Sequence, residues 1–171
     1  MIYTQRCASP LGEILLAADD QGLTGLWFME GQKHLGQGLS PAAVECASPC
    51  FDQARRWLDI YFSGRDPGFT PPLHLVGTEF RNRVGEILLQ IPYGRTVTYG
   101  EIARRIAAER GDGHMSSRAV GGAVGKNPIS LIVPCHRVVG SDGSLTGYGG
   151  GLWRKEKLLE LEKRGSRGKA P

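Results

Sequence analysis

The sequence lacks several features that would assign it to a specialised class of protein. It has 171 residues, and none of its stretches approaches the ~18 consecutive apolar residues of a membrane-spanning helix. Residues 1–6 do not begin an apolar signal core. Its four cysteines are too few for a disulfide scaffold. We therefore expect a cytoplasmic protein that makes no membrane contact and keeps its cysteines reduced.

Glycine is the residue present in excess. It supplies 25 of the 171 positions, roughly twice the average share of about 7%. There is no Gly-X-Y period, which excludes a collagen-like chain. Apolar residues make up 40% of the sequence and charged residues 22%, a composition that supports a packed core. The length then predicts one domain or two small ones.

Charge is distributed unevenly along the chain. Residues 1–85 carry 7 basic and 9 acidic side chains, a net charge of −2. Residues 86–171 carry 14 basic and 8 acidic side chains, a net charge of +6. A basic half beside a mildly acidic one is typical of a protein that binds a polyanion. A solvated basic surface would give the same count, so charge alone leaves both interpretations open.

The first 77 residues predict a small N-terminal domain. Two turn signals separate three short apolar runs, which indicates an antiparallel meander over 2–7, 13–18 and 23–29. A polar, glycine-rich stretch then predicts a loop over 30–48. Apolar residues at helical spacing predict a helix over 51–62. The proline-rich residues 63–77 look like a linker or an extended edge.

Residues 78–165 predict a helical C-terminal domain. Thr78 can cap a first helix, and Thr98-Tyr99-Gly100-Glu101 fits a capping box that opens a second, extending to about residue 109. Ser116 or Ser117 can cap a short helix over 118–125. These last two helices resemble a helix-turn-helix, although the connector is longer than usual.

A final helix is expected over 152–163, followed by a disordered basic tail at 166–171. The fold class is therefore α+β. It consists of a small antiparallel-sheet N-terminal domain and a helical C-terminal domain with a helix-turn-helix-like DNA-binding element.

A cysteine and a histidine are adjacent in Pro134-Cys135-His136-Arg137, directly after the buried-looking run 129–133. A thiol is a useful nucleophile only as thiolate, which requires a neighbouring base or positive charge. His136 and Arg137 are residue types that could supply both. A buried cysteine beside a surface histidine would read the same way, so this pair alone does not establish a catalytic site.

Longer motifs around Cys135 resemble those of the methylated-DNA–protein-cysteine methyltransferases, also called O6-alkylguanine-DNA alkyltransferases. The motifs are Arg118-Ala119-Val120-Gly121-Gly122-Ala123, Asn127-Pro128, Ile132-Val133-Pro134-Cys135-His136-Arg137-Val138-Val139, Gly147-Tyr148-Gly149-Gly150-Gly151 and Lys155-Glu156. Their order and spacing match the family over roughly residues 78–163. Residues 1–77 resemble it only in layout.

The resemblance implies a role for five residues in the chemistry. Cys135 looks like the alkyl acceptor, His136 like the base that takes the thiol proton through a water, and Glu162 like the carboxylate that orients the histidine. Asn127 looks like the residue that holds the turn before the active-site segment. Tyr99 looks like the phenol that donates a hydrogen bond to the departing guanine. Without the resemblance, Glu162 reads as a solvated charge and Tyr99 as a core aromatic.

The resemblance also implies binding of double-stranded DNA through the minor groove by the helix at 118–125. Arg118 looks like the side chain that fills the space left by an extruded base. On its own it would read as a phosphate contact. The other expected DNA-contacting residues are small and lie beside it: Ser117, Ala119, Gly121 and Gly122.

A pocket for the flipped base is expected under the glycine-rich residues 147–151. The resemblance implies that the carbonyl of Val138 and the N–H of Gly149 face guanine, with Tyr148 in the same pocket. Many relatives have serine or alanine where Gly149 stands. We therefore expect a wider pocket here, which would admit larger alkyl groups.

Neither a cofactor nor a metal is expected. No glycine pattern follows a strand and opens a helix as a phosphate-binding loop does. In this family the damaged DNA is itself the alkyl donor. Some members bind zinc in the N-terminal domain, and five candidate ligands are present here: Cys7, His34, Cys46, Cys50 and His74. The residues before the helix at 78 do not place a histidine at the position where those relatives have one.

The sequence thus predicts direct, single-turnover repair of O6-alkylguanine, and of O4-alkylthymine, by a monomer. One alternative is a DNA-damage sensor of similar fold without transfer activity, although relatives of that kind lack the cysteine. A second is a cysteine hydrolase that uses Cys135, His136 and Glu162, which would leave the Arg118 helix without a role. The connector at 109–117 looks longer than in close relatives and leaves the pose of Tyr99 against Arg118 open.

Overall fold

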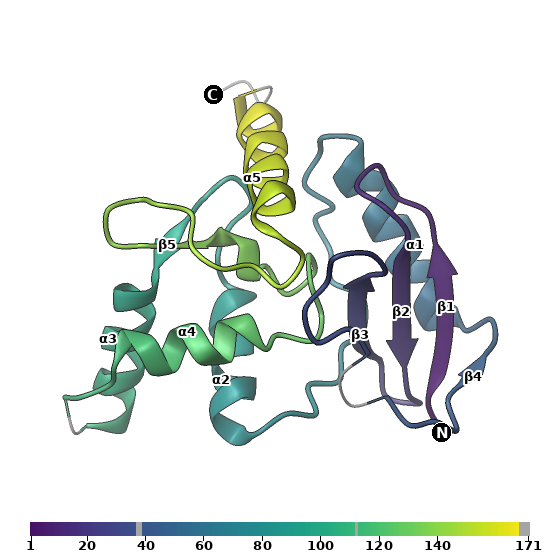
Figure 1. The fold of residues 1–171 in the computed structure, drawn as a ribbon, viewed down its shortest axis with the longest axis horizontal. Helices are drawn as coiled ribbons and strands as arrows, with labels where there is room; N and C mark the ends of the chain where they lie inside the picture. Colours follow the sequence, from purple (N-terminus) through teal and green to yellow (C-terminus); the bar gives the residue numbers. More distant parts are fainter. Residues whose placement is uncertain (37–38, 112, 168–171) are drawn as a thin grey trace.

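A four-stranded sheet forms one side of the molecule (Figure 1). The computed structural model describes residues 1–36, 39–111 and 113–167. Three strands form the predicted antiparallel meander, and β4 (Val44–Glu45) pairs in parallel with β1, giving the order β3-β2-β1-β4. The meander consists of β1 (Tyr3–Cys7), β2 (Ile14–Ala18) and β3 (Leu23–Phe28). β4 was not predicted because two residues show no periodicity.

Helix α1 (Pro49–Phe62) packs against this sheet. Ser48 caps it, because its side chain accepts a hydrogen bond from the Cys50 N–H. One face is buried at helical spacing, through Phe51, Ala54, Trp57, Leu58 and Tyr61. Each fully buried large apolar side chain contributes about 1.5–3 kcal/mol relative to exposure. The helix ends at Phe62, where the prediction placed it.

Four further helices make up the other side of the molecule: α2 (Glu79–Leu88), α3 (Tyr99–Arg110), α4 (Ser117–Gly125) and α5 (Leu152–Arg167). Thr78 caps α2, and the capping box between Thr98 and Glu101 opens α3. Ser116 caps α4, so Ser117 is the first residue of that helix. Helices α3 and α4 pack together across the connector 111–116, of which residue 112 lies outside the described residues.

The buried run at 129–133 joins the two sides. The Leu26 N–H of β3 donates to Pro128 O at 2.8 Å, and the Ser130 N–H donates back to Leu26 O at 3.1 Å. The chain then enters a 3-10 turn at Cys135–Arg137 and β6 (Val138–Val139). This strand pairs in parallel with β5 (Val97–Thr98) directly before α3. Short parallel pairs between distant segments leave no local sequence signal, which is why neither strand was predicted.

Helix α5 carries the chain to its last described residues. It continues through Ser166 and Arg167, two residues into the segment predicted as a disordered tail. That prediction is wrong for these two positions because the last helical turn packs against Gly94, where a side chain would collide with Ser166. The rest of the predicted tail, residues 168–171, lies outside the described residues. Among the described residues, no helix is both long and apolar enough to cross a membrane.

Candidate active site

Cys135 begins the 3-10 turn at the end of the buried run, where Asn127 holds the preceding backbone. The Asn127 Nδ2 donates to the carbonyls of Ile129 (3.2 Å) and Val133 (2.8 Å), and its Oδ1 accepts from the Ile129 N–H at 3.1 Å. Three hydrogen bonds from one carboxamide therefore fix the turn that delivers Cys135.

The Cys135 side chain is buried, with 6% of its surface exposed. Burial raises the pKa of the thiol, while the Asn127 carboxamide and the Lys155 ammonium oppose that rise by favouring the thiolate. Because burial dominates, the resting side chain is a thiol rather than a thiolate. Nucleophilic attack by this sulfur consequently requires a base that removes its proton.

His136 has the protonation state of such a base. Its Nε2 lies 2.5 Å from the Glu162 Oε2, and its ring is completely buried. Burial lowers the pKa of the imidazole, against the opposing effect of Glu162, so the ring is neutral at pH 7. Because a carboxylate only accepts hydrogen bonds, we assign the proton to Nε2, which leaves Nδ1 with a lone pair. Nδ1 has no hydrogen-bond partner among the described residues.

The Glu162 carboxylate accepts hydrogen bonds from residues on both sides of the molecule. Besides His136, its donors are the Tyr61 hydroxyl (2.7 Å), the Gly94 N–H (3.0 Å) and the Arg137 guanidinium (2.8 and 3.2 Å). Burial opposes its ionisation, yet His136 and Arg137 lower the pKa of this carboxyl to about 2. Glu162 therefore stays ionised beside the imidazole, where a carboxylate would stabilise an imidazolium.

The interpretation of Glu162 as a solvated charge is wrong. Glu156 and Glu160 on the same helix are exposed, whereas Glu162 is 1% exposed. It shares the buried face of α5 with Lys155 and Leu158 at spacings of three and four residues. The sequence offered one signal that could have predicted this burial: Glu162 falls on the apolar face of its helix.

Lys155, rather than Arg137, supplies the positive charge beside Cys135. The Arg137 guanidinium faces Glu162 and donates to Ile91 O at 2.7 Å. Lys155 is completely buried, and its Nζ donates to the carbonyls of Val138 (2.6 Å) and Thr146 (2.7 Å). Burial lowers its pKa to about 8, against the opposing effect of Cys135. The sequence contained Lys155 within a family motif, but nothing local indicated its burial.

Tyr99 lies between helix α4 and the glycine-rich segment. It is the first residue of α3 and half-buried. Its hydroxyl donates to the carbonyl of Thr146 at 3.4 Å and accepts from the Thr146 hydroxyl at 3.3 Å. A Cβ on Gly121 would lie 3.8 Å from its ring. The half-buried ring packs against the hydrophobic core, as the alternative interpretation expected, while the hydroxyl reaches Thr146, directly before the glycine-rich segment.

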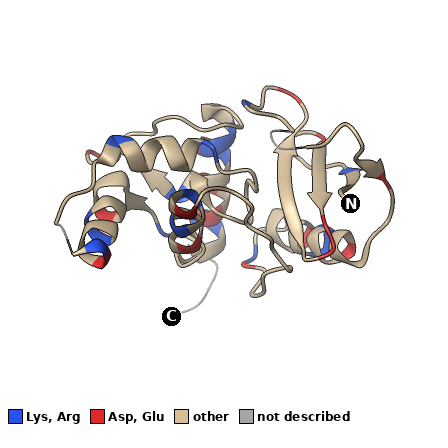
Figure 2. Cartoon of the chain, turned by 90° about the horizontal axis from the view of Figure 1, so that it is seen from below, with Lys and Arg blue, Asp and Glu red and all other residues tan. Residues whose placement is uncertain are grey.

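The outward face of α4 has little side-chain bulk. Ser117, Arg118, Ala119 and Gly122 are exposed, and Gly121 is half-buried against Tyr99. Val120, Ala123 and Val124 form the buried face. No acidic residue occupies the first turn, so the positive end of the helix dipole is uncompensated there. Figure 2 shows blue positions on the helical side of the molecule, with red positions interspersed on the C-terminal helix.

The glycine-rich segment 147–151 adjoins the same centre. Tyr148 is buried, and its ring lies edge-on to the His136 ring with centroids 6.5 Å apart. The Val138 carbonyl, expected to face guanine, accepts the hydrogen bond from Lys155. The space beside Gly149 is occupied, because a Cβ there would lie 2.7 Å from the Gln32 Nε2. A glycine at this position therefore does not by itself widen the pocket.

In the described part of the chain, the candidate zinc ligands are not arranged as a metal site. Cys7, Cys46 and Cys50 are free thiols, and the His74 Nδ1 lies 2.5 Å from the Asp19 Oδ2. Over residues 1–36, 39–111 and 113–167, no group of three or more His, Cys, Asp or Glu side chains is placed to hold a metal ion.

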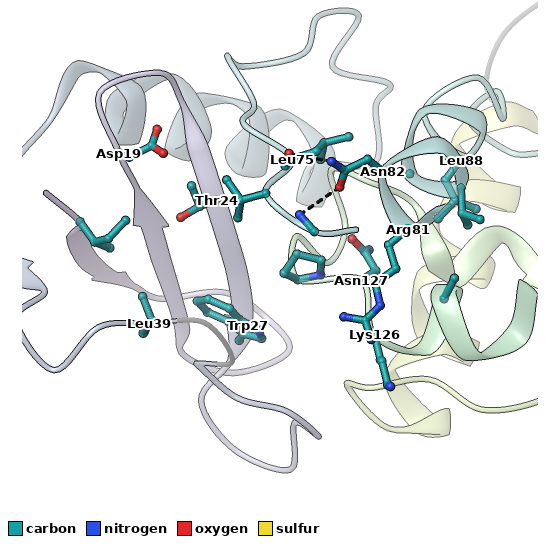
Figure 3. Close-up of a pocket in the computed structure, with 17 residues that line it drawn as sticks. Asp19, Thr24, Trp27, Leu39, Leu75, Arg81, Asn82, Leu88, Lys126 and Asn127 are labelled. Carbon is teal, nitrogen blue, oxygen red and sulfur yellow. Dashed lines mark hydrogen bonds between the residues drawn. The ribbon is translucent and has the colours of Figure 1, made fainter. Parts of the chain in front are cut away.

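A cavity of about 230 Å³ lies behind the active-site segment, between the sheet and the helices (Figure 3). Thr24 and Trp27 line it from β3, and Arg81 and Lys126 line it from the helical side. Asn127 also borders it, whereas Cys135, His136 and Glu162 do not. The three residues proposed to react therefore do not line this cavity.

Two family models match the chain. Residues 79–164 match the DNA binding domain of 6-O-methylguanine DNA methyltransferase, and residues 2–75 match its ribonuclease-like domain. The chain belongs to the methylated-DNA–protein-cysteine methyltransferase family. It is accordingly a direct-reversal DNA-repair methyltransferase that transfers an alkyl group from DNA to a cysteine of its own.

Individual relatives resemble it over almost their entire length. The methylated-DNA–protein-cysteine methyltransferase of Methanosarcina acetivorans is 47% identical over 154 residues, covering 90% of this chain and 94% of the relative. That of Mycobacterium leprae is 45% identical over 165 residues, covering 95% and 93%. The crystal structure of Mycobacterium tuberculosis OGT in complex with DNA matches with a TM-score of 0.78 and 42% identity, covering 95% of this chain and 94% of that one.

Proposed function

We propose that Cys135 is the alkyl acceptor and that O6-alkylguanine in double-stranded DNA is the donor. Three observations support this proposal: Cys135 is a buried, protonated thiol, the adjacent residue His136 is a buried, neutral imidazole whose Nδ1 has no hydrogen-bond partner among the described residues, and the Glu162 carboxylate lies at its Nε2. These are the groups needed to activate one cysteine sulfur as a nucleophile.

The reaction balances with the groups present. The Cys135 thiol gives its proton through a water to the Nδ1 of His136, and the resulting imidazolium remains paired with Glu162. The thiolate attacks the alkyl carbon, so an S–C bond forms while the C–O6 bond breaks. The electron pair of that bond stays on guanine, which takes up one proton from water, while the imidazolium returns the thiol proton to water. Because the product thioether is a stable bond, each molecule acts once.

Tyr99 acts on the leaving guanine and Lys155 on the attacking sulfur. A hydrogen bond from the Tyr99 hydroxyl to guanine stabilises the charge that develops as the C–O6 bond breaks. The Lys155 ammonium favours the thiolate on the sulfur side. Its hydrogen bonds to Val138 and Thr146 also hold the two backbone segments that border the base pocket.

We propose that α4 enters the minor groove and that Arg118 fills the space of the extruded nucleotide. The exposed face of small residues on α4 supports a close approach of the DNA backbone. Extruding a paired base costs a few kcal/mol, and an inserted side chain offsets part of this cost. Ser117 and Ala119 flank Arg118 at the positive end of the helix, where phosphate oxygens bind favourably.

We propose a division of labour in which residues 78–165 carry the chemistry and the DNA contacts and residues 1–77 form the supporting domain. The Tyr61–Glu162 hydrogen bond favours a direct contribution of the N-terminal domain to the site. We further propose that the protein is a cytoplasmic monomer, that O4-alkylthymine is a second substrate, and that no metal or cofactor takes part.

A comparison of two substrates tests the role of Arg118. Transfer from duplex DNA carrying O6-methylguanine requires base extrusion, whereas transfer from free O6-benzylguanine does not. We expect Arg118→Ala to slow the first reaction by about 10-fold or more, a cost of roughly 1.4 kcal/mol, and to spare the second. Arg65→Ala, an exposed arginine outside α4, is the matched control. Equal losses on both substrates would remove the extrusion role.

A further inference from the structure

The segment that follows β3 lies against the glycine-rich segment before α5 (Figure 1). The backbone N–H of Lys33 donates to the carbonyl of Gly149, with an N···O distance of 2.7 Å. Gln32 adds a side-chain contact at the same place, because its Nε2 lies 2.7 Å from the position of a Cβ on residue 149. Real Cβ atoms essentially never approach another heavy atom this closely. The Gln32 carboxamide thus occupies the space that glycine leaves open.

The Gln32 side chain is held in place by its own strand end. Its Oε1 accepts a hydrogen bond from the Phe28 N–H at 3.1 Å, and its Nε2 donates to the Lys33 carbonyl at 3.3 Å. The residue is half-buried. These contacts give the carboxamide a defined position, unlike that of a free surface side chain.

Arg154 fixes the two segments against each other. Its guanidinium is 3% exposed and donates to Glu30 O (2.7 Å) and Gly150 O (2.9 Å) through Nη1, and to Leu11 O (3.0 Å) through Nε. It also lies 4.4 Å from the centroid of the Phe28 ring. The buried guanidinium therefore joins the backbone before Gln32 to the backbone after Gly149. These hydrogen bonds fix the position of Gln32 relative to Gly149.

The contact adjoins the surfaces that handle the substrate. A Cβ on Gly149 would also lie 3.9 Å from the carbonyl of Gly125, at the end of α4. The neighbouring Tyr148 ring faces His136. Gln32 therefore reaches, from the N-terminal domain, a point between the proposed DNA-facing helix and the catalytic histidine.

We propose that Gln32 is a specificity-determining residue whose carboxamide forms the pocket wall beside Gly149 and limits the size of the alkyl group delivered to Cys135. The inference rests on the proposed function, in which the segment 147–151 covers the flipped base. It replaces the expectation of a wide pocket, since the N-terminal domain fills the space that a side chain at 149 would take. The wall is the far end of a flexible side chain, so substitutions change it without moving the backbone.

Single-turnover transfer from duplexes carrying O6-methylguanine or O6-benzylguanine tests this role. Gln32→Ala removes the wall, and we expect the benzyl-to-methyl rate ratio to rise about 3- to 10-fold, within the range that changes in pocket volume produce. Gln32→Leu keeps a side chain of similar size and is expected to leave the ratio within about twofold of the original. Gln53→Ala, on the exposed side of α1, is the matched control.

The benzyl-to-methyl rate ratio shows whether Gln32 forms a wall of the pocket or only stabilises the fold. A Gln32→Ala change that lowers both rates equally, or alters neither, would overturn the inference. The proposed function fails separately, through the absence of transfer to Cys135 in the unmodified protein. A second pair of variants, Gly149→Ser and Gly149→Ser/Gln32→Ala, tests whether the side chains at 149 and 32 occupy the same space. Gly149→Ser displaces the Gln32 carboxamide, and we expect the double variant Gly149→Ser/Gln32→Ala to return the ratio toward the original. Additive effects of the two changes would contradict the shared space.

Discussion

Tyr61 and Glu162 are 101 positions apart in the sequence, yet the tyrosine hydroxyl donates a 2.7 Å hydrogen bond to the carboxylate oxygen that also contacts His136. Both side chains are buried. The bond connects α1, in the N-terminal domain, to His136 through a single carboxylate. The N-terminal domain therefore helps to fix the geometry around His136, the proposed base, as well as stabilising the fold.

Removing this hydrogen bond is expected to have a limited effect. Tyr61→Phe keeps the ring and leaves Glu162 with four other hydrogen bonds, so we expect a loss of about 1 kcal/mol in the free energy of unfolding. The rate of alkyl transfer should fall by less than about 10-fold. Denaturant unfolding and single-turnover transfer measure the two effects. Tyr3→Phe, whose hydroxyl makes an exposed hydrogen bond to Asp20, serves as control. A loss of the fold in Tyr61→Phe would contradict this account.

Removing the charge of Glu162 should cost far more. Glu162→Gln leaves the buried Arg137 without its anion, and breaking a buried ion pair from one side costs about 3–5 kcal/mol. The imidazolium of His136 also loses its partner, so transfer should slow by about 100-fold or more. Glu160→Gln changes an exposed glutamate on the same helix and should alter neither quantity. Similar behaviour of the two variants would disprove the role of Glu162.

The acid stability of the protein should depend on Glu162. Its pKa is about 2 in the folded protein and 4.5 ordinarily, so the unfolded chain binds the proton more tightly. The stabilisation by this carboxylate is therefore complete above about pH 4.5 and is lost as the pH falls toward 2. Unfolding free energies measured from pH 6 to pH 2 should show a shallower decline in Glu162→Gln than in the unmodified protein. Parallel curves would contradict the low pKa.

Lys155 should set the pH dependence of the thiol. Its charge lowers the pKa of Cys135, and its own pKa is about 8. Lys155→Met removes the charge, so the pH profile of transfer to free O6-benzylguanine should move to higher pH and the rate at pH 7 should fall. Lys157→Met, an exposed lysine two residues along, is the control. A lower rate with an unmoved pH profile would assign Lys155 a packing role only.

Arg154 should stabilise the contact between the two domains. Arg154→Leu retains apolar bulk but leaves the carbonyls of Leu11, Glu30 and Gly150 without this donor. An unpaired buried polar group costs about 1–3 kcal/mol, so we expect a loss in that range or above it. Hydrogen exchange should become faster at Lys33, whose N–H is bonded to Gly149. Unchanged protection at Lys33 would show that Arg154 does not hold this contact.

Elements with local signals could be predicted from the sequence. The meander follows from apolar runs and turn residues, and the starts of α2 and α3 follow from Thr78 and the Thr98 capping box. The family motifs indicated Cys135, His136 and Asn127, and the structure brings these segments together. Each of these signals lies within a few residues of the feature that it predicts.

Features that depend on distant segments could not be predicted. The two-residue strands β5 and β6 pair across about 40 positions of chain, and Gln32 meets Gly149 between separate domains. The burial of Lys155 depends on carbonyls from two other segments. The sequence therefore indicated Cys135 and His136 as candidate reactive residues, but it did not indicate the contacts made by their distant neighbours.

The mass of the intact protein after incubation with duplex DNA carrying O6-methylguanine tests the central claim most directly. Replacement of one hydrogen by one methyl group adds about 14 Da, and we expect one such addition per molecule, located by peptide mapping on Cys135. Cys135→Ser should gain no mass. A methyl group on another residue, repeated turnover by one molecule, or addition to Cys135→Ser would contradict Cys135 as the acceptor.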